Sequence, residues 1–140
     1  IYQFGVYTGR GLARIAHSVC GSSDRCGQVW GFDSFQGIPE DSAEEKENWR
    51  NPRGVPKKDF LSGGYSAANS LNIYNLSQLL GAVRRVVGWE RNLTLVPGFF
   101  NNSLNGELLR RHTLQPALHV DMDADIYLSA FEPLDWMFAH

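Results

Sequence analysis

The chain has 140 residues, 13 lysines and arginines against 15 aspartates and glutamates, and 43% hydrophobic residues. This composition is typical of one soluble globular domain, and its net charge of −2 gives no basic surface of the kind that nucleic-acid-binding proteins carry. No run approaches the roughly 18 uncharged apolar residues that a membrane span needs, so we expect neither a membrane nor a nucleic acid as a partner.

The predicted elements of the first half begin with a short apolar strand over residues 1–7. Residues 9–11 open a helix that ends by Gly21, and a second strand covers residues 28–32. Cys20 and Cys26, with no second pair nearby, predict free thiols, a reducing compartment and a cytoplasmic protein. Residues 39–69 are rich in charge, glycine and proline, which predicts a lid-like insertion over an acceptor pocket; the alternative is a solvated insertion without a function. The apolar contacts of the lid would be Trp49, Phe60 and Tyr65.

The second half continues the alternation. Helical spacing covers residues 76–87, a strand covers residues 93–96, a helix covers residues 102–111, a fourth strand covers residues 117–120, and a helix begins at residue 129. Alternating strands and helices predict an α/β fold with a parallel sheet covered on both faces. The chain begins within one predicted element and ends within another, so we expect a partial domain over residues 1–140.

A glycine turn follows the first predicted strand. It runs from Gly5 to Gly11, and Asp33 follows the second strand 22 residues later. Glycines let backbone amides approach a ligand at a helix start, and an acid after the second strand is placed to accept hydrogen bonds from ribose hydroxyls. The glycine turn and Asp33 together indicate a nucleoside-containing cofactor. The alternative is that the glycines only make a tight turn and Asp33 caps a loop.

A short-chain dehydrogenase that binds NAD(P) is a weaker alternative for the same turn. That chemistry requires a tyrosine with a lysine four residues further on, because the lysine lowers the pKa of the tyrosine. The lysines of this chain are Lys46, Lys57 and Lys58, and none follows a tyrosine at that spacing.

Three acids gather at the end of the fourth predicted strand: Asp121, Asp123 and Asp125, with Tyr127 after them. Like charges repel and resist desolvation, so such a cluster is typical of a site where a metal or a cationic ligand offsets the repulsion. The alternative is a solvated turn whose aspartates cap the next helix.

Four blocks occur in order along the chain: GVYTG at 5–9, GFDSFQGIPE at 31–40, PGFFNNSL at 97–104 and DADIYLS at 123–129. Together they resemble the macrocin O-methyltransferase (TylF-like) family of class I S-adenosylmethionine-dependent methyltransferases. The resemblance implies a Rossmann-like three-layer sandwich, truncated after the fourth strand. It also implies an enzyme that methylates a hydroxyl of a small molecule, such as a sugar, with the help of magnesium.

The resemblance also assigns site residues. The cofactor-binding residues would be Gly5, Val6, Tyr7, Thr8, Gly9, Asp33, Ser34, Phe35, Gly98 and Phe99. Asp123 would be a metal ligand, and the other ligands would come from a fifth strand that this chain does not contain, so metal binding by this chain alone should be weak. No catalytic base is assigned, and a homo-oligomer is left open.

One residue departs from the family pattern. Gln3 stands where relatives carry an acid, so a catalytically inactive domain that still binds the cofactor is the alternative function.

Overall fold

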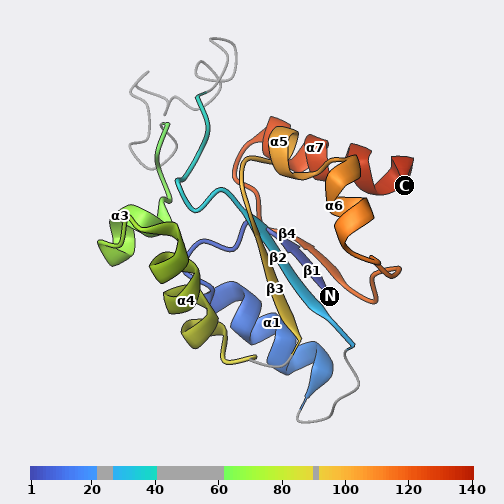
Figure 1. The fold of residues 1–140 in the computed structure, drawn as a ribbon, viewed down its shortest axis with the longest axis horizontal. Coiled ribbons are helices and arrows are strands. Elements are labelled where there is room, and N and C mark those ends of the chain that lie inside the picture. Colours follow the sequence, from blue (N-terminus) through green and yellow to red (C-terminus); the bar gives the residue numbers. More distant parts are fainter. Residues whose placement is uncertain (22–26, 41–61, 90–91) are drawn as a thin grey trace, which may run out of the picture.

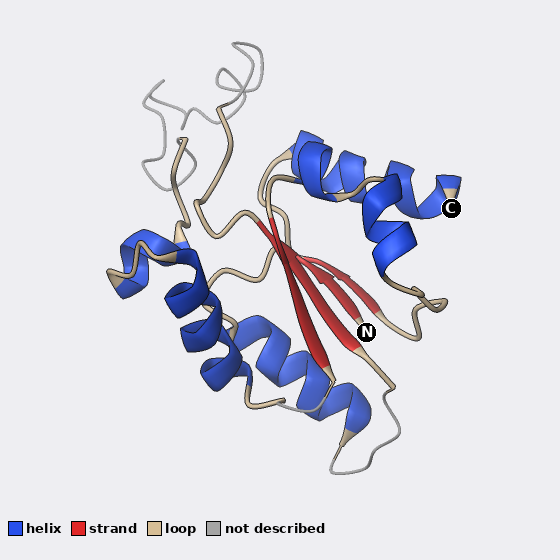
Figure 2. Cartoon of the chain, viewed as in Figure 1, coloured by secondary structure: helices blue, strands red, loops and turns tan. Residues whose placement is uncertain are grey.

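The computed structural model describes residues 1–21, 27–40, 62–89 and 92–140. Its strands are β1 (Tyr2–Phe4), β2 (Val29–Asp33), β3 (Leu93–Pro97) and β4 (Val120–Met122). Its helices are α1 (Arg10–Cys20), α3 (Ala67–Leu71), α4 (Leu76–Val87), α5 (Phe100–Ser103), α6 (Gly106–Arg111) and α7 (Tyr127–Ala139). Figure 1 shows the strands side by side between two groups of helices, and Figure 2 separates the two kinds of element by colour.

The four strands form one parallel sheet in the order β3-β2-β1-β4. The chain therefore moves outward from β1 to β3 and then returns to the other side of β1. The winding direction reverses between β1 and β4, and in open parallel sheets this is where ligands bind, beyond the carboxyl ends of the strands.

Alternate residues of each strand point to opposite sides of the sheet, and apolar residues predominate in both sets, so both faces are apolar. On one face, Leu93 and Leu95 of β3 join Val29 and the buried side of α1 and α4. On the other face, an aromatic layer packs beneath α5, α6 and α7. It contains Tyr2, Phe4, Trp30 and Phe32 from the strands, and Trp136 of α7 packs against them. This arrangement confirms the predicted three-layer α/β fold, with helices on both faces of a parallel sheet (Figure 1).

The first and fourth strands lie at different positions from those predicted. β1 ends at Phe4 because Gly5 has a φ of 89°, which turns the chain away from the sheet. β4 lies at Val120–Met122, two to three residues later than its apolar run indicated. Asp121 is therefore inside the strand, opposite Gln3 of β1, and the Gln3 side chain Nε2 donates to Asp121 Oδ2 at 2.8 Å. Because Asp121 is charged, the apolar pattern of the sequence did not indicate that it lies within β4.

The helix predicted over residues 102–111 is two helices. The Asn105 side chain accepts hydrogen bonds from the backbone N–H groups of Glu107 and Leu108 at 2.9 and 3.1 Å. This cap begins α6 and separates it from α5. α5 begins at Phe100, soon after β3 ends at Pro97, so it lies at the carboxyl ends of the strands.

Two further expectations concern Cys20 and the insertion. Cys20 is disulfide-bonded, so the prediction of a free thiol there is wrong, and the argument for a reducing compartment and a cytoplasmic protein loses its basis. Trp49, Phe60 and most of the predicted lid lie outside the described residues, whereas residues 67–69 of its range belong to α3. Among the described helices, none is long and apolar enough to cross a membrane.

Candidate functional site

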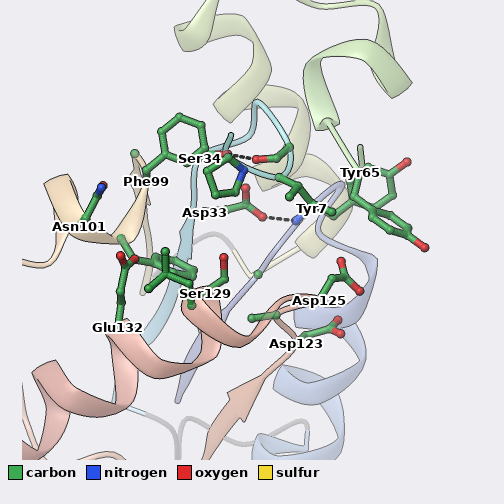
Figure 3. Close-up of a pocket in the computed structure, with 18 of the residues that line it drawn as sticks. Tyr7, Asp33, Ser34, Tyr65, Phe99, Asn101, Asp123, Asp125, Ser129 and Glu132 are labelled. Atoms are coloured by element: carbon green, nitrogen blue, oxygen red, sulfur yellow. Dashed lines mark hydrogen bonds between the residues drawn. The ribbon is translucent and has the colours of Figure 1, made fainter. Parts of the chain in front are cut away.

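A cavity of about 350 Å³ opens at the carboxyl ends of β1, β2, β3 and β4 (Figure 3). Its position is the one that the strand order predicts for a ligand site. Its lining comes from segments far apart in the sequence, which the sheet brings together. The residues are Gly5, Tyr7, Asp33, Ser34, Gly37, Ile38, Pro39, Glu40, Tyr65, Gly98, Phe99, Phe100, Asn101, Asp123, Ala124, Asp125, Leu128, Ser129 and Glu132.

The glycine turn closes one end of the cavity. A Cβ at Gly5 would lie 2.0 Å from the backbone oxygen of Asp123, so only glycine lets the chain after β1 pass the chain after β4 this closely. The backbone N–H of Asp123 donates to the Phe4 oxygen at 2.9 Å and fixes the same approach. Gly9 lies at the opposite end of the turn, with Val83 and Val87 of α4 against it. The two glycines therefore hold the turn against two different elements.

Asp33 ties the glycine turn to the end of β2. Its Oδ2 accepts the backbone N–H groups of Val6 at 2.6 Å and Tyr7 at 2.7 Å, and its Oδ1 accepts that of Phe35 at 2.5 Å. Burial raises the pKa of Asp33, and these three amides partly offset that effect because they stabilise the carboxylate. A carboxylate offers about four acceptor positions. Three are occupied, so Asp33 has room for about one more donor from the cavity.

Most of the predicted cofactor residues converge on this cavity. Gly5, Tyr7, Asp33, Ser34, Gly98 and Phe99 line it, as does the predicted metal ligand Asp123.

The remaining predicted residues have structural positions instead. Val6 and Phe35 are buried in the core beneath the turn, Gly9 packs on α4, and Thr8 is not part of the lining. Direct contact between these four residues and a ligand stays a prediction.

Two tyrosines stand together at the cavity. The rings of Tyr7 and Tyr65 meet edge to face, with centroids 6.1 Å apart, and the Tyr7 hydroxyl lies 2.5 Å from Ser70 Oγ of α3. Both tyrosines have a positive φ, 52° and 54°, which bulky residues adopt only when their surroundings impose it. Backbone strain of this kind clusters at ligand sites, and here it aims two aromatic rings at one cavity.

The opposite wall follows β2 and β3. Ser34 Oγ donates to the Gly37 oxygen at 3.0 Å and accepts the Gln36 N–H at 3.1 Å, which fixes the tight turn after Asp33. The backbone N–H of Gly98 donates to the Asp33 oxygen at 2.9 Å. Phe99 follows Gly98 and is the N-cap residue of α5. This wall presents Phe99, Phe100 and several backbone groups, which suits a flat heterocycle better than a charged group.

Carboxylates gather at the end of the cavity that lies between β1 and β4 (Figure 3). Burial raises the pKa of Asp125, and the charges of Asp123 and Asp33 raise it further. Burial and the charge of Asp121 likewise raise the pKa of Asp123. Ile126, rather than Asp125, is the N-cap of α7, and it makes no side-chain cap, so the acids are not there to begin that helix. Their mutual repulsion is a cost that a cationic ligand would relieve.

The burial of Asp125 and its repulsion by Asp123 and Asp33 together predict a pH-dependent difference in stability. A raised pKa means that Asp125 contributes stability below its unfolded value of 3.8, and this contribution is lost as the pH rises through the folded value. At pH 7, Asp125→Asn should therefore raise the Tm, by about 2 °C because solvent screens an exposed side chain.

Thermal unfolding at pH 7 and at pH 3 checks this. The gain should vanish at pH 3, where both forms are neutral. Asp135→Asn, at an exposed position on α7, is the matched control and should change little at either pH. A destabilised Asp125→Asn at pH 7 would contradict the repulsion.

The sequence missed the contribution of α7. Leu128, Ser129 and Glu132 all line the cavity from this helix. Their spacing of three and four places them on one helical face, and two polar residues on that face were the available signal. The sequence does not show which way this face of α7 points, because the position of α7 over the sheet depends on the register of β4.

No group of three histidine, cysteine, aspartate or glutamate side chains converges as a metal site within the described residues. Asp121 is turned toward Gln3, and the Gln3 Oε1 is buried with no partner among the described residues. Asp123 and Asp125 reach the cavity, and their oxygens are ligands of the kind that Mg²⁺ prefers. Within the described residues, these two carboxylates are the acids at this end of the cavity, and they do not by themselves make a metal site.

Comparison with known proteins identifies the fold. No protein-family model and no curated protein matches the sequence. The crystal structure of CalS11, a calicheamicin methyltransferase, superposes with a TM-score of 0.66 at 17% identity, over 99% of this chain and 52% of that chain. The structure of the O-methyltransferase NovP superposes with a TM-score of 0.54 at 22% identity, over 99% of this chain and 51% of that chain.

The two solved structures are about twice as long as this chain, which therefore spans about half of each. At these identities the likeness establishes the fold alone. The chain has an α/β fold whose four-stranded parallel sheet matches about half of a Rossmann-like methyltransferase.

Proposed function

We propose that the cavity binds S-adenosylmethionine and that the chain forms the cofactor-binding half of an O-methyltransferase. The observation that carries the proposal is the meeting of the glycine turn, Asp33, Gly98 and Phe99 around one cavity at the switch point of the sheet. The four sequence blocks of the TylF-like resemblance lie on these same segments. The two structures of similar fold are both described as methyltransferases.

The proposed pose follows from the chemistry of the walls. The adenine would lie against Phe99 and the backbone after β3, and the ribose would reach the free acceptor position of Asp33. The methionine part would extend along the glycine turn toward Asp123 and Asp125. Asp33 can then accept a hydrogen bond from about one ribose hydroxyl while its other acceptor positions hold the glycine turn. The same carboxylate would therefore fix the shape of the cavity and bind the cofactor.

The acceptor would be a hydroxyl of a small molecule, such as a sugar. Methyl transfer to an alcohol depends mainly on positioning, because the oxygen must lie in line with the methyl group and the sulfur. The face of α7 that carries Ser129 and Glu132 borders the cavity and offers hydrogen-bonding groups for such an acceptor.

Magnesium would be held by Asp123. A divalent ion there would make the acceptor hydroxyl easier to deprotonate. Because no group of three ligating side chains converges within the described residues, we expect weak binding of magnesium by this chain.

Calorimetric titration of the chain with S-adenosylhomocysteine tests the proposal. We expect saturable one-to-one binding that Gly98→Leu abolishes, because a bulky side chain at a φ of 137° beside Ser103 would block the wall. Gly27→Leu, at an open position, should bind as the unchanged chain does. Binding of NAD in place of S-adenosylhomocysteine would instead favour the dehydrogenase alternative.

The inactive alternative is supported by Gln3, whose amide contacts Asp121. Cofactor binding without transfer to any hydroxyl acceptor, by a protein that includes this chain together with the rest of a methyltransferase domain, would favour a binding domain.

A further inference from the structure

The short helix α3 is held in place by contacts with the chain after β2 and with the core. The backbone N–H of Ala68 donates to the Phe35 oxygen at 3.1 Å. Ser66 caps the helix, since its side-chain oxygen accepts the Asn69 N–H at 3.2 Å, and Ala67 is fully buried in the core. A helix of five residues is too short to be stable by itself, so these contacts determine where α3 lies.

The other end of α3 reaches the glycine turn. The Ser70 hydroxyl lies 2.5 Å from the Tyr7 hydroxyl, within hydrogen-bond distance, although 63 positions separate the two residues in the sequence. Tyr7 lines the cavity, whereas Ser70 does not. The backbone of Tyr7 is held separately, because its N–H donates to Asp33 Oδ2 at 2.7 Å. Two different elements therefore fix Tyr7, one at its backbone and one at its hydroxyl.

These contacts form a closed circuit around Asp33. One carboxylate oxygen of Asp33 accepts the Tyr7 N–H, and the other accepts the Phe35 N–H at 2.5 Å. Tyr7 is joined through its hydroxyl to Ser70, and Phe35 is joined through its carbonyl oxygen to Ala68. Ser70 and Ala68 both belong to α3, which closes the circuit. A change at Ser70 would therefore act first on Tyr7, and not on the backbone of the glycine turn.

The same circuit determines which part of Tyr7 a ligand meets. The Tyr7 ring packs edge to face against the ring of Tyr65, and the two stand together at one side of the cavity (Figure 3). Because Ser70 engages the hydroxyl, Tyr7 offers its ring to a ligand and not its hydroxyl. A side chain that is already ordered loses less conformational entropy when a ligand binds against it.

We propose that Ser70 is a positioning residue for the cofactor, whose hydroxyl fixes the Tyr7 ring as a wall of the cavity before the ligand binds. The inference rests on the proposed function. It adds a residue that lies outside the cavity lining and outside the four blocks of the TylF-like resemblance. Without the Ser70 hydroxyl, the Tyr7 side chain would gain access to other rotamers, and binding would have to order it. Asp33 would still hold the Tyr7 backbone, so the fold should persist.

Titration of the chain and its variants with S-adenosylhomocysteine tests the role of Ser70. We expect Ser70→Ala to weaken binding about threefold, which is the effect of one hydrogen bond at a solvent-exposed position. Its Tm should change little, because Ser70 is exposed and alanine favours a helix. Ser70→Thr keeps the hydroxyl and should restore most of the affinity. Ser77→Ala, at an exposed serine of α4 outside the cavity lining, is the matched control and should leave binding unchanged.

A double-mutant cycle assigns the effect to the contact between the two hydroxyls. Tyr7→Phe removes the other hydroxyl and keeps the ring, so it should weaken binding as much as Ser70→Ala does. The double variant should bind no more weakly than either single variant, because each change already breaks the same hydrogen bond. Losses that multiply in the double variant would mean that the two hydroxyls act independently, and the positioning role would be wrong.

The outcomes also separate this inference from the proposed function. If the unchanged chain binds S-adenosylhomocysteine and Ser70→Ala binds it equally well, the positioning role is wrong and the proposed function stands. If Ser70→Thr binds as weakly as Ser70→Ala, the hydroxyl is not the cause and the positioning role is again wrong. If the unchanged chain does not bind S-adenosylhomocysteine, the proposed function is wrong, and the positioning role is wrong with it.

Discussion

Asp33→Ala is expected to destabilise the fold and to abolish cofactor binding together. The change leaves the backbone N–H groups of Val6, Tyr7 and Phe35 without their acceptor. Val6 and Phe35 are buried, so solvent cannot readily replace the carboxylate there. Unsatisfied buried donors cost about 1–3 kcal/mol each, and removal of a desolvated charge offsets part of this, so we expect a net loss of about 2–3 kcal/mol. Urea unfolding measures it.

Asp33→Asn sharpens this test. Both carboxylate oxygens of Asp33 accept N–H groups, so an amide must turn its own N–H₂ toward at least one donor. The variant should be destabilised although its shape is kept. Asp135→Ala is the control, because Asp135 is exposed and its loss should change stability by less than about 0.5 kcal/mol. An Asp33→Ala variant as stable as the unchanged chain would contradict the role of Asp33 in holding the turn.

Gly5→Ala is expected to have the largest effect of any single methyl group added to this chain. The new Cβ would lie 2.0 Å from the Asp123 oxygen and 2.8 Å from its carbonyl carbon, and both belong to the backbone. The φ of 89° adds strain for any residue with a Cβ. Relief requires the ends of β1 and β4 to separate, at the cost of the bond from Asp123 N–H to Phe4. We expect a loss of about 4 kcal/mol or more.

Two other glycines separate the causes of that loss. Gly88 has a φ of 66° and open space around it, so Gly88→Ala reports the backbone strain alone, about 1 kcal/mol. Gly27 has open space and no positive φ, so Gly27→Ala should be nearly neutral. The difference between Gly5→Ala and Gly88→Ala then measures the approach of β4 to β1. Equal losses for these two variants would mean that the approach is not tight.

The order of strands and helices was predictable because both faces of the sheet are apolar and the helices are amphipathic. The β4 position was not, because Asp121 lies within the strand and Gln3 accommodates it across the sheet. The hydrogen bond between Gln3 and Asp121 joins two strands far apart in the sequence, so no local sequence pattern reveals it. The split between α5 and α6 at Asn105 was visible in principle, since asparagine is a common N-cap.

The residues that line the cavity were predictable wherever they lie at the end of a strand. Gly5, Gly98 and Asp123 each follow a strand and Asp33 is the last residue of β2, and parallel strands bring such ends to one edge of a sheet. Val6 and Phe35 belong to the same motifs but are buried in the core, which the motifs alone do not reveal. Glu132 and Ser129 depend on the placement of α7, which only the assembled fold determines.

The disulfide at Cys20 was also beyond the sequence argument. One cysteine pair in a chain of ordinary composition gives no framework to recognise, so free thiols were the default expectation.

Mapping of the bound cofactor by amide chemical shifts tests the central claim most directly. In a titration of the labelled chain with S-adenosylhomocysteine, the account predicts that the largest shifts fall on Gly5, Tyr7, Ser34, Gly98 and Phe99, which line the cavity. The amides of Gly88 and Leu118, remote from the cavity lining, should not move. Saturating shifts confined to other surfaces, or no shifts at millimolar ligand, would contradict a cofactor site at the switch point of this sheet.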